Sequence, residues 1–454
     1  MVAKMALDRY ISRLAKILVD SEGVTFNGAQ RRLRALTLEV VVGPDATSPA
    51  AHSAALTVVS VGRRTFVGGV RLVGAINQPT NCALPLASSS LGEAAEKLGA
   101  ANFKGAPSRR IVIGTAETAE DGRAIGVWWD GWRAGTGKPG ACRRTHSDNP
   151  LAGIAAGALA VGMAFEAERG RCQEPVSEIV LWPTLDGHDD APSFSDVFLP
   201  GALWLIGLGN LGQAFLWALA ALPYENPGEV SLVLQDRDKI SEENWSTSVL
   251  VGDETYGALK TRVAEQWALA KGFEVRRIDR MLVATDRLDD TDPRLAFCGV
   301  DKVEPRRHMA RVGFDCIVDA GLGRKANDFD RYRVTIFNGG RPIDKHFADQ
   351  EDPRVSDDIP ADEAYQRLLG EIGRCGTTEV AGASVAAPYV SAVTAAVAVS
   401  RLIAIVSGCD CPPSEVGRLS ALGSRRIARP VDAVARGVRH AGRPKSVGSL
   451  GGSL

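Results

Sequence analysis

The feature that most constrains the fold is a glycine loop between a short apolar strand and an apolar helix. The chain runs from Leu203 through Trp-Leu-Ile into Gly207-Leu-Gly209-Asn-Leu-Gly212 and continues as an apolar helical run to Leu222. Glycines permit a tight turn, a close approach of the backbone to an oxygen, and close packing of the helix on the strand. Backbone N–H groups and the positive end of the helix then converge on one point, which suits a phosphate. The pattern predicts a nucleotide-binding α/β unit.

The residues after the loop indicate which nucleotide it holds. A second strand, 230–235, ends at Asp236, whose carboxylate can accept hydrogen bonds from ribose hydroxyls, as in NAD-dependent enzymes. The polar residues that come next are not typical of a dehydrogenase: Asp238, Asn244, Lys260 at the start of a helix, and Asp301 after an apolar strand.

In this order the residues resemble the adenylation domain of the E1-like superfamily, which includes the ThiF and MoeB type enzymes and the ubiquitin-activating enzymes. That family has a glycine loop, an acidic pair after the second strand, then an asparagine, a lysine and a distant aspartate, and each position is filled here. The resemblance spans residues 200–420, about half of the chain. It implies a Rossmann-like α/β fold with a mainly parallel sheet.

The resemblance also implies roles for single residues. Asp236, with Asp238 beside it, would bind the ribose of ATP, and the glycine loop would bind its phosphates. Asn244 and Lys260 would contact the phosphates, and Asp301 would help to hold Mg²⁺ near the reacting α-phosphate. Attack of a carboxylate on the α-phosphorus builds charge on phosphoryl oxygens, which cations stabilise. A carboxylate ligand suits Mg²⁺, so ATP and Mg²⁺ are the expected cofactors.

One position departs from the family pattern. An arginine normally lies three residues past the asparagine, and this chain has Thr247 there. A threonine cannot replace a bidentate phosphate partner. Either another arginine supplies the charge, which we favour, or the enzyme is slow or inactive. The candidate substitutes are Arg262, Arg306 and Arg307, which are near in sequence, and Arg9 and Arg13 from an N-terminal helix.

Simpler roles stay open for several of these residues. Asp236 could cap the turn after its strand, Lys260 could be a solvated helix lysine, and Asp301 could cap a helix that begins near Pro305. Asp319 ends a further buried strand at a glycine turn, and we assign it no role beyond that turn.

Many E1-like proteins pass the adenylated acyl group to a cysteine. Of the eight cysteines, Cys375 lies in Gly373-Arg374-Cys375-Gly376, which we expect to be a loop before a long apolar helix. The family's catalytic cysteine often occupies a loop at this place, and the arginine and helix start would favour the thiolate. The alternative is a bystander cysteine. Cys409-Asp-Cys411, without a second pair, does not match a structural zinc site.

We divide the chain into three parts. Residues 1–195 are expected to form an N-terminal α/β domain, with 176–200 as the connection. A sheet with an Ala-rich helix resembles the degenerate first half of larger E1-like enzymes, so we interpret this domain as an inactive adenylation-like half, although it has no glycine loop. Residues 196–424 would form the ATP-binding adenylation domain. Residues 425–454, basic and then rich in glycine and serine, would form a flexible tail. The first part shows helix patterns at 1–19 and 149–166 and strand patterns at 36–42, 56–61, 110–114 and 125–132.

Composition bounds the function. A net charge of −1 gives no support for nucleic-acid binding. Irregularly spaced cysteines without a secretory signal suit the cytoplasm. The uncharged stretch 380–400 has few large side chains, and therefore predicts a buried helix over the nucleotide sheet in place of a membrane span.

Three functions from different classes remain. The first is an ATP-dependent adenylyltransferase that activates the C-terminal carboxylate of a small ubiquitin-like or sulfur-carrier-like protein or peptide, with Cys375 as thioester acceptor. The second is a non-catalytic E1-like nucleotide-binding scaffold, motivated by Thr247. The third is an NAD-dependent oxidoreductase, against which Lys260 and Asp301 argue. A homodimer is expected by analogy, although two fused halves could complete the site within one chain.

Overall fold

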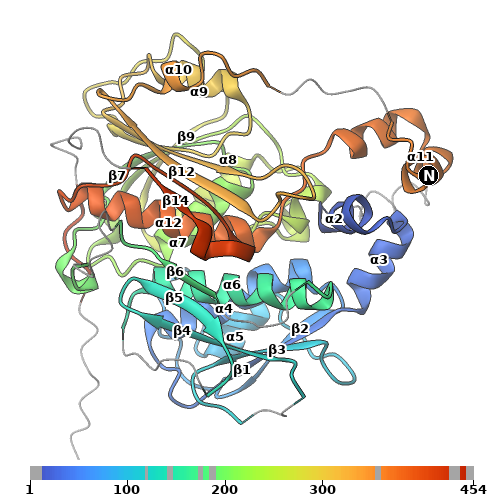
Figure 1. Cartoon of the computed structure of the whole chain (residues 1–454). Helices are drawn as coiled ribbons and strands as arrows, with labels where there is room; N and C mark the ends of the chain where they lie inside the picture. Colours follow the sequence, from blue (N-terminus) through green and yellow to red (C-terminus); the bar gives the residue numbers. More distant parts are fainter. Residues whose placement is uncertain are drawn as a thin grey trace, which may run out of the picture.

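Two sheets organise the chain, with helices between and around them (Figure 1). The computed structural model describes residues 13–117, 121–140, 147–171, 177–183, 191–352, 359–428 and 440–445. All strands before residue 181 join the first sheet and all strands after residue 201 join the second. The limits of the three predicted parts stay a prediction.

The first sheet has the strand order β2-β1-β3-β4-β5-β6. Its strands are β1 (Thr37–Val42), β2 (Gly69–Gly74), β3 (Arg109–Ile113), β4 (Ala124–Asp130), β5 (Arg133–Gly137) and β6 (Ser177–Val180). The first four are parallel, and β5 and β6 add to them as antiparallel strands. The strand patterns at 36–42, 110–114 and 125–132 are confirmed, and β6 lies inside the segment that we expected to be a connection.

The second sheet has the order β14-β13-β12-β11-β10-β7-β8-β9. Its parallel strands are β7 (Ala202–Ile206), β8 (Ser231–Gln235), β9 (Glu274–Ile278), β10 (Leu295–Cys298) and β11 (Cys316–Leu322). Antiparallel strands extend one edge: β12 (Arg331–Asn338), β13 (Ser414–Arg418) and β14 (Arg426–Ile427). The mainly parallel α/β fold is confirmed. The strand order reverses between β7 and β10, and ligands of open α/β sheets bind outside the carboxyl ends of the strands at such a switch point.

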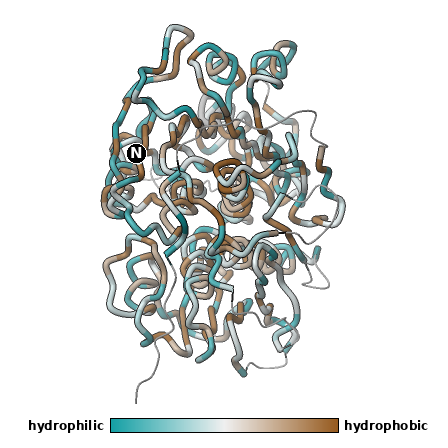
Figure 2. The backbone as a smooth tube through the Cα atoms, turned by 90° about the vertical axis from the view of Figure 1, so that its left-hand side faces the viewer, coloured by the Kyte–Doolittle hydropathy of each residue, from teal (hydrophilic) through white to brown (hydrophobic). Residues whose placement is uncertain are grey.

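Four long helices form a buried layer between the two sheets: α4 (Pro49–Thr65), α6 (Pro150–Glu168), α7 (Asn210–Ala220) and α12 (Pro388–Val406) (Figure 1). Asn149 caps α6 by accepting a hydrogen bond from the Leu151 N–H at 3.0 Å, so the helix pattern there is confirmed. Figure 2 shows the hydrophobic segments gathered in this middle layer. By length and composition α6 and α12 could cross a membrane, but 83% and 100% of their apolar windows are buried inside the protein, as expected of core helices.

The remaining helices are shorter or lie outside this layer. They are α2 (Arg13–Glu22), α3 (Phe26–Ala35), α5 (Leu91–Lys97), α8 (Lys260–Lys271), α9 (Val303–Met309), α10 (Ile343–His346) and α11 (Glu363–Gly382), together with the 3₁₀-helices η1 (Phe194–Asp196), η2 (Pro227–Glu229), η3 (Glu242–Ser246), η4 (Asp253–Thr255) and η5 (Leu419–Ser424). The helix α2 agrees with the N-terminal helix pattern, of which residues 1–12 lie outside the described part.

Two expectations about local structure were wrong. The run 56–61 is not a strand but the middle of α4, where it is buried on all sides. A short apolar run cannot distinguish a buried strand from a buried helix by periodicity, and here Ser48 and Pro49 start a helix that the run continues. The segment 425–454 is not wholly a free tail, because Arg426–Ile427 pair with β13 and the Ala441 N–H donates to the Leu199 carbonyl at 2.8 Å.

Candidate functional site

The glycine loop lies at the switch point of the second sheet, between the carboxyl ends of β7 and β10. Gly207 has a left-handed φ of +85°, and a Cβ on it would stand 2.9 Å from the Val300 nitrogen, so only glycine lets these two loops touch. A Cβ on Gly212 would stand 2.0 Å from the Gly207 carbonyl oxygen, because the helix packs directly on the turn. Both glycines are needed to shape the loop.

Gly209 has the opposite surroundings. It is the N-cap of α7, and no described heavy atom lies within 4 Å of the position that its Cβ would take. Open space at a helix N-terminus, in front of unpaired backbone N–H groups, is the arrangement that binds a phosphate.

The acidic pair after β8 is tied to this loop and to Lys260. The Asp236 carboxylate accepts from the Leu208 N–H at 2.7 Å and from the Asp238 N–H at 2.8 Å, so it does cap its turn. Lys260, the first residue of α8, donates to the Asp238 carboxylate at 2.9 Å. Burial by itself would raise the pKa of Asp238, but the hydrogen bond and the charge of Lys260, together with Arg237, outweigh it and hold that pKa below the usual value. Lys260 is therefore not a free solvated lysine.

Asn244 lies in the segment between β8 and α8. Asn244 lies in η3, where its side-chain oxygen accepts from the Ser241 N–H at 2.9 Å. Thr247, at the place of the expected arginine, is buried, and its hydroxyl oxygen lies 3.5 Å from the Asn244 carbonyl oxygen. Thr247 thus packs inward and carries no charge to the site.

Gln213, which the sequence reasoning missed, joins the glycine loop to the segment that follows η3. Gln213 is the single polar side chain in the first two turns of α7 after Asn210, and it is fully buried. Its amide donates to the Leu208 carbonyl of the glycine loop at 3.1 Å and its oxygen accepts from the Leu250 N–H at 3.1 Å. A lone glutamine in an otherwise apolar run was the signal that could have identified it.

Asp301 follows β10 on the other side of the switch point. It is exposed, and within the described part of the chain its carboxylate makes no hydrogen bond or ion pair. It is not the cap of the next helix, because α9 begins at Val303 with Lys302 as N-cap, and Asp352 accepts from the Val303 N–H at 2.9 Å. That alternative was wrong, and the carboxylate is available to solvent.

Of the candidate arginines in the described residues, Arg13 is the one that contacts the segment of Asn244. Its guanidinium donates to Glu243 at 2.9 Å and to the Ser384 carbonyl at 2.8 Å. Arg306 is held by the buried Asp319 at 2.7 Å, and Arg307 donates to backbone carbonyls near Phe347. Arg262 is exposed on α8, and Arg9 lies outside the described residues.

Asp319 does not end a strand, as we expected, but lies in the middle of β11. It is fully buried and bonded to Arg306 at 2.7 Å and to Arg333 at 2.6 Å. Burial by itself would lower the pKa of Arg306, but Asp319, with smaller contributions from Cys298 and Asp301, outweighs it and raises that pKa. The cluster joins α9 to β11 and β12, so it is structural and removes Arg306 from the candidate arginines.

We expected Cys375 to lie in a loop, but it lies inside α11. The helix is broken at Gly373, which has φ +75° and ψ 174°, so Cys375 lies in the first turn of the second helical piece. In Figure 1, α11 lies at the right-hand edge beside α2 and α3. The loop prediction failed because Gly373 interrupts the helix for one residue only, and the chain resumes helical geometry after it.

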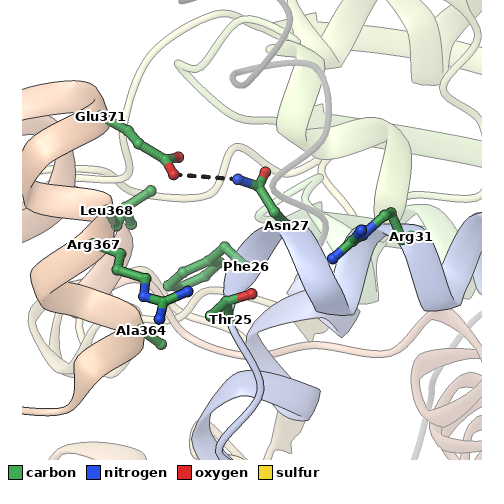
Figure 3. A pocket seen from close by; sticks show the side chains of 8 residues that line it. All are labelled: Thr25, Phe26, Asn27, Arg31, Ala364, Arg367, Leu368 and Glu371. Carbon is green, nitrogen blue, oxygen red and sulfur yellow. Dashed lines mark hydrogen bonds between the residues drawn. The ribbon is translucent and has the colours of Figure 1, made fainter.

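Few contacts hold α11. Lys16 of α2 donates to the Tyr365 hydroxyl at 2.6 Å, and that hydroxyl donates to Asp20 at 2.7 Å. A groove of about 200 Å³ separates α3 from α11, and Figure 3 shows the Asn27 amide and Glu371 carboxylate bonded across it at 3.2 Å. The cysteine-bearing helix thus rests on the N-terminal helices.

The first sheet has a comparable strand-to-helix turn between β1 and α4 with different chemistry. There Pro44 lacks an N–H, and the Asp45 carboxylate accepts from the Thr115 N–H and hydroxyl at 2.6 and 2.7 Å. A negative charge at this turn would repel a phosphate. The interpretation of this half as inactive stays a prediction.

Comparisons with known proteins match both halves of the chain. A family model described as the BilD C-terminal domain matches residues 199–409, and one described as the BilD N-terminal domain matches residues 37–178. The bacterial E1-like protein BilD of Collimonas sp. (strain OK412) is 34% identical over 414 residues, which are 88% of this chain and 89% of that protein.

Solved structures give weaker similarities. A structure of E. coli MccB with succinimide is 13% identical with a TM-score of 0.36, covering 70% of this chain and 98% of that one. A structure of PaaA is 14% identical with a TM-score of 0.32, covering 50% of this chain and 64% of that one. Similarity at this level transfers no site residue to this chain.

Proposed function

Because this chain belongs to the BilD family of bacterial E1-like proteins, we propose that it is an ATP-dependent adenylyltransferase. Its substrate would be the C-terminal carboxylate of a small ubiquitin-like or sulfur-carrier-like protein or peptide. The observation that carries the proposal is the open space at Gly209, at the head of α7 and at the switch point of the sheet, with Lys260 and Asp301 on either side.

The reaction makes one bond and breaks one. A carboxylate oxygen of the substrate attacks the α-phosphorus of ATP, the bond from that phosphorus to the bridging oxygen of the β-phosphate breaks, and pyrophosphate leaves. The product is an acyl adenylate. Negative charge grows on the phosphoryl oxygens, so catalysis rests on positioning and on cations.

In this proposal the protein groups around the loop bind ATP. The backbone N–H groups at Gly209 receive phosphate oxygens. Asp236 keeps lone pairs for the ribose hydroxyls beside its two backbone bonds, since an ionised carboxylate has about four acceptor sites. The ion pair of Lys260 with Asp238 is partly exposed and so weak in water. A phosphate of ATP can therefore replace Asp238 as the partner of Lys260. Asn244 would contact the phosphates as well.

Mg²⁺ fits this site as a shared ion. Among the described residues there is no group of three or more His, Cys, Asp or Glu that could hold a metal ion by itself. Mg²⁺ is commonly bound by one or two carboxylates together with substrate phosphates and waters. Asp301 is an exposed carboxylate at the right strand end, so it would hold Mg²⁺, which would neutralise phosphate charge.

We assign the missing arginine charge to Arg13. It lies against η3, and its partly exposed pair with Glu243 can open when phosphates arrive. In the unliganded protein the described hydrogen bonds of Arg13 join it to Glu243, Ser246 and Ser384, and not to the glycine loop. Thr247 itself cannot supply this charge.

We include Cys375 as the acceptor of the acyl group. Its thiolate would attack the acyl carbon, a thioester would form and AMP would leave. A thiol in the first turn of a helical piece is stabilised as the thiolate by the helix dipole. The test is a thiol-sensitive adduct that Cys375→Ser abolishes and Cys409→Ser retains, because Cys409 is partly exposed and lies after the end of α12.

The test of the main proposal is ATP–pyrophosphate exchange with purified protein and small proteins encoded near it. Lys260→Met and Asp301→Ala should abolish exchange. Lys97→Met is the matched control, because Lys97 forms a 2.8 Å ion pair with Glu93 on α5 of the first sheet. Exchange that persists in Asp301→Ala would refute the proposal. ATP binding without exchange, for every partner, would favour the scaffold function instead.

A further inference from the structure

A buried arginine of the first-sheet half reaches into the nucleotide half. Arg64, near the end of α4, is 1% exposed. Its guanidinium donates to the Ser60 carbonyl at 2.5 Å, to Val249 at 3.2 Å and to Val251 at 2.8 Å. The last two carbonyls lie between Asn244 and α8. Separations of 185 and 187 residues make these contacts purely tertiary.

Arg63 adds a second cation at the same place. It donates to the Val251 carbonyl at 3.1 Å and to Leu98 at 2.8 Å. Both guanidinium groups face the ring of Trp245, at 5.7 Å for Arg63 and 5.8 Å for Arg64. The pair therefore holds both ends of the segment 245–251.

This arrangement is costly as mere packing. Burial of a guanidinium is unfavourable unless its charge and N–H groups are compensated. Within the described residues Arg64 has no carboxylate partner, and its Nε has no hydrogen-bond partner. The charge of Arg64 is compensated instead by backbone carbonyls, two of which belong to the segment 245–251. The same hydrogen bonds therefore hold that segment in place.

The held segment connects directly to the glycine loop. Leu250, between the two bonded carbonyls, donates its N–H to Gln213 at 3.1 Å, and Gln213 donates to the Leu208 carbonyl at 3.1 Å. At the other end, the Ser248 N–H donates to the Asn244 carbonyl at 2.8 Å. Displacement of the carbonyls at 249 and 251 would therefore shift both Asn244 and the glycine loop.

We propose that Arg64 is a positioning residue of the nucleotide site, through which the first-sheet half sets the geometry of the glycine loop. The inference rests on the proposed function and extends it. It gives the half without a glycine loop an indirect part in ATP binding, through the position of the glycine loop.

The chain offers a matched control for simple fastening of the halves. Lys271 of α8 also crosses between them, and its ammonium donates to the carbonyls of Ala83 at 2.7 Å and Leu222 at 3.1 Å. These carbonyls do not belong to the segment 245–251. Lys271→Met therefore removes a half-buried cation from the interface without touching the loop.

The experiment measures ATP dissociation constants, urea unfolding midpoints and amide hydrogen exchange of unliganded full-length protein. Arg64→Met should weaken ATP binding tenfold or more and speed amide exchange in residues 245–251. Arg64→Lys should fall between this variant and wild type, because one ammonium keeps the charge but cannot bond to all three carbonyls in a fork. Lys271→Met should bind ATP within twofold of wild type.

A second variant keeps the test decisive if Arg64→Met does not fold. Gln213→Met cuts the connection to the glycine loop within α7 and should weaken ATP binding by a similar factor. ATP binding by Arg64→Lys and Gln213→Met equal to wild type would overturn the inference, and so would equal losses in the Arg64 and Lys271 variants. Wild-type protein that binds no ATP would overturn the proposed function as well, so the two failures are distinct.

Discussion

Two glycines of the same loop should respond to alanine in opposite ways. At Gly209 a methyl group meets no described atom within 4 Å, and the backbone angles, φ −75° and ψ −151°, suit alanine. Alanine is a poorer helix N-cap than glycine, so Gly209→Ala should cost below about 1 kcal/mol in free energy of unfolding. At Gly212 the methyl would stand 2.0 Å from the Gly207 carbonyl oxygen. The backbone must move, and such overpacking costs about 1–3 kcal/mol.

For ATP binding, Gly209 is the position of interest. The methyl of Gly209→Ala fills the space that we assign to a phosphate, so ATP affinity should fall at least tenfold, which is about 1.4 kcal/mol. Urea unfolding gives the stability of each variant and titration calorimetry gives its ATP affinity. Gly339→Ala is the control, because Gly339 lies in an exposed turn with no described atom near its Cβ position.

Clear outcomes would refute this reasoning. Gly209→Ala with wild-type ATP affinity would mean that the open space at the head of α7 does not hold a phosphate. Gly212→Ala with wild-type stability would mean that α7 does not pack on the turn as closely as the structure shows.

Three further predictions concern buried charge and the proposed arginine. Glu415→Gln leaves the buried Arg401 without its ion-pair partner and should lower the free energy of unfolding by about 3–5 kcal/mol, measured in urea. Burial lowers the pKa of His52 from 6.5 to about 4, so the unfolded chain binds more protons between these values. Stability should therefore be lost as pH falls through that window, by up to about 3 kcal/mol, and His52→Gln should flatten the profile. Arg13→Gln should slow pyrophosphate exchange about a hundredfold with little change in unfolding midpoint, since its pair with Glu243 is partly exposed; an unchanged exchange rate would exclude Arg13.

Much of the fold could be predicted because its signals are local. The glycine loop, the strand ends at Gln235 and Cys298, and the cap at Asn149 each depend on a few consecutive residues. Parallel strands align their carboxyl ends at one edge, so residues after β7, β8 and β10 had to meet there. The cytoplasmic location, the partner protein and the homodimer stay predictions.

The errors arose where a local pattern had two solutions. The run 56–61 is apolar enough for a strand or a buried helix, and the contacts of α4 with α6 and α12 decided for the helix. The stretch around Cys375 looked like a loop because of its glycines, but Gly373 breaks the helix for one residue and helical geometry resumes after it.

The sequence alone therefore determined the α/β class, the glycine turn and the family, because spacing along the chain is enough to specify them. Only the tertiary structure decided which partner each of the candidate arginines has. Arg306 is taken by Asp319, Arg13 lies against Glu243, and Arg64 holds the carbonyl of Val249 across 185 residues of sequence. The physical reason is that a buried charge must be compensated where it lies, and its partner is set by the packing of whole elements rather than by neighbours in sequence.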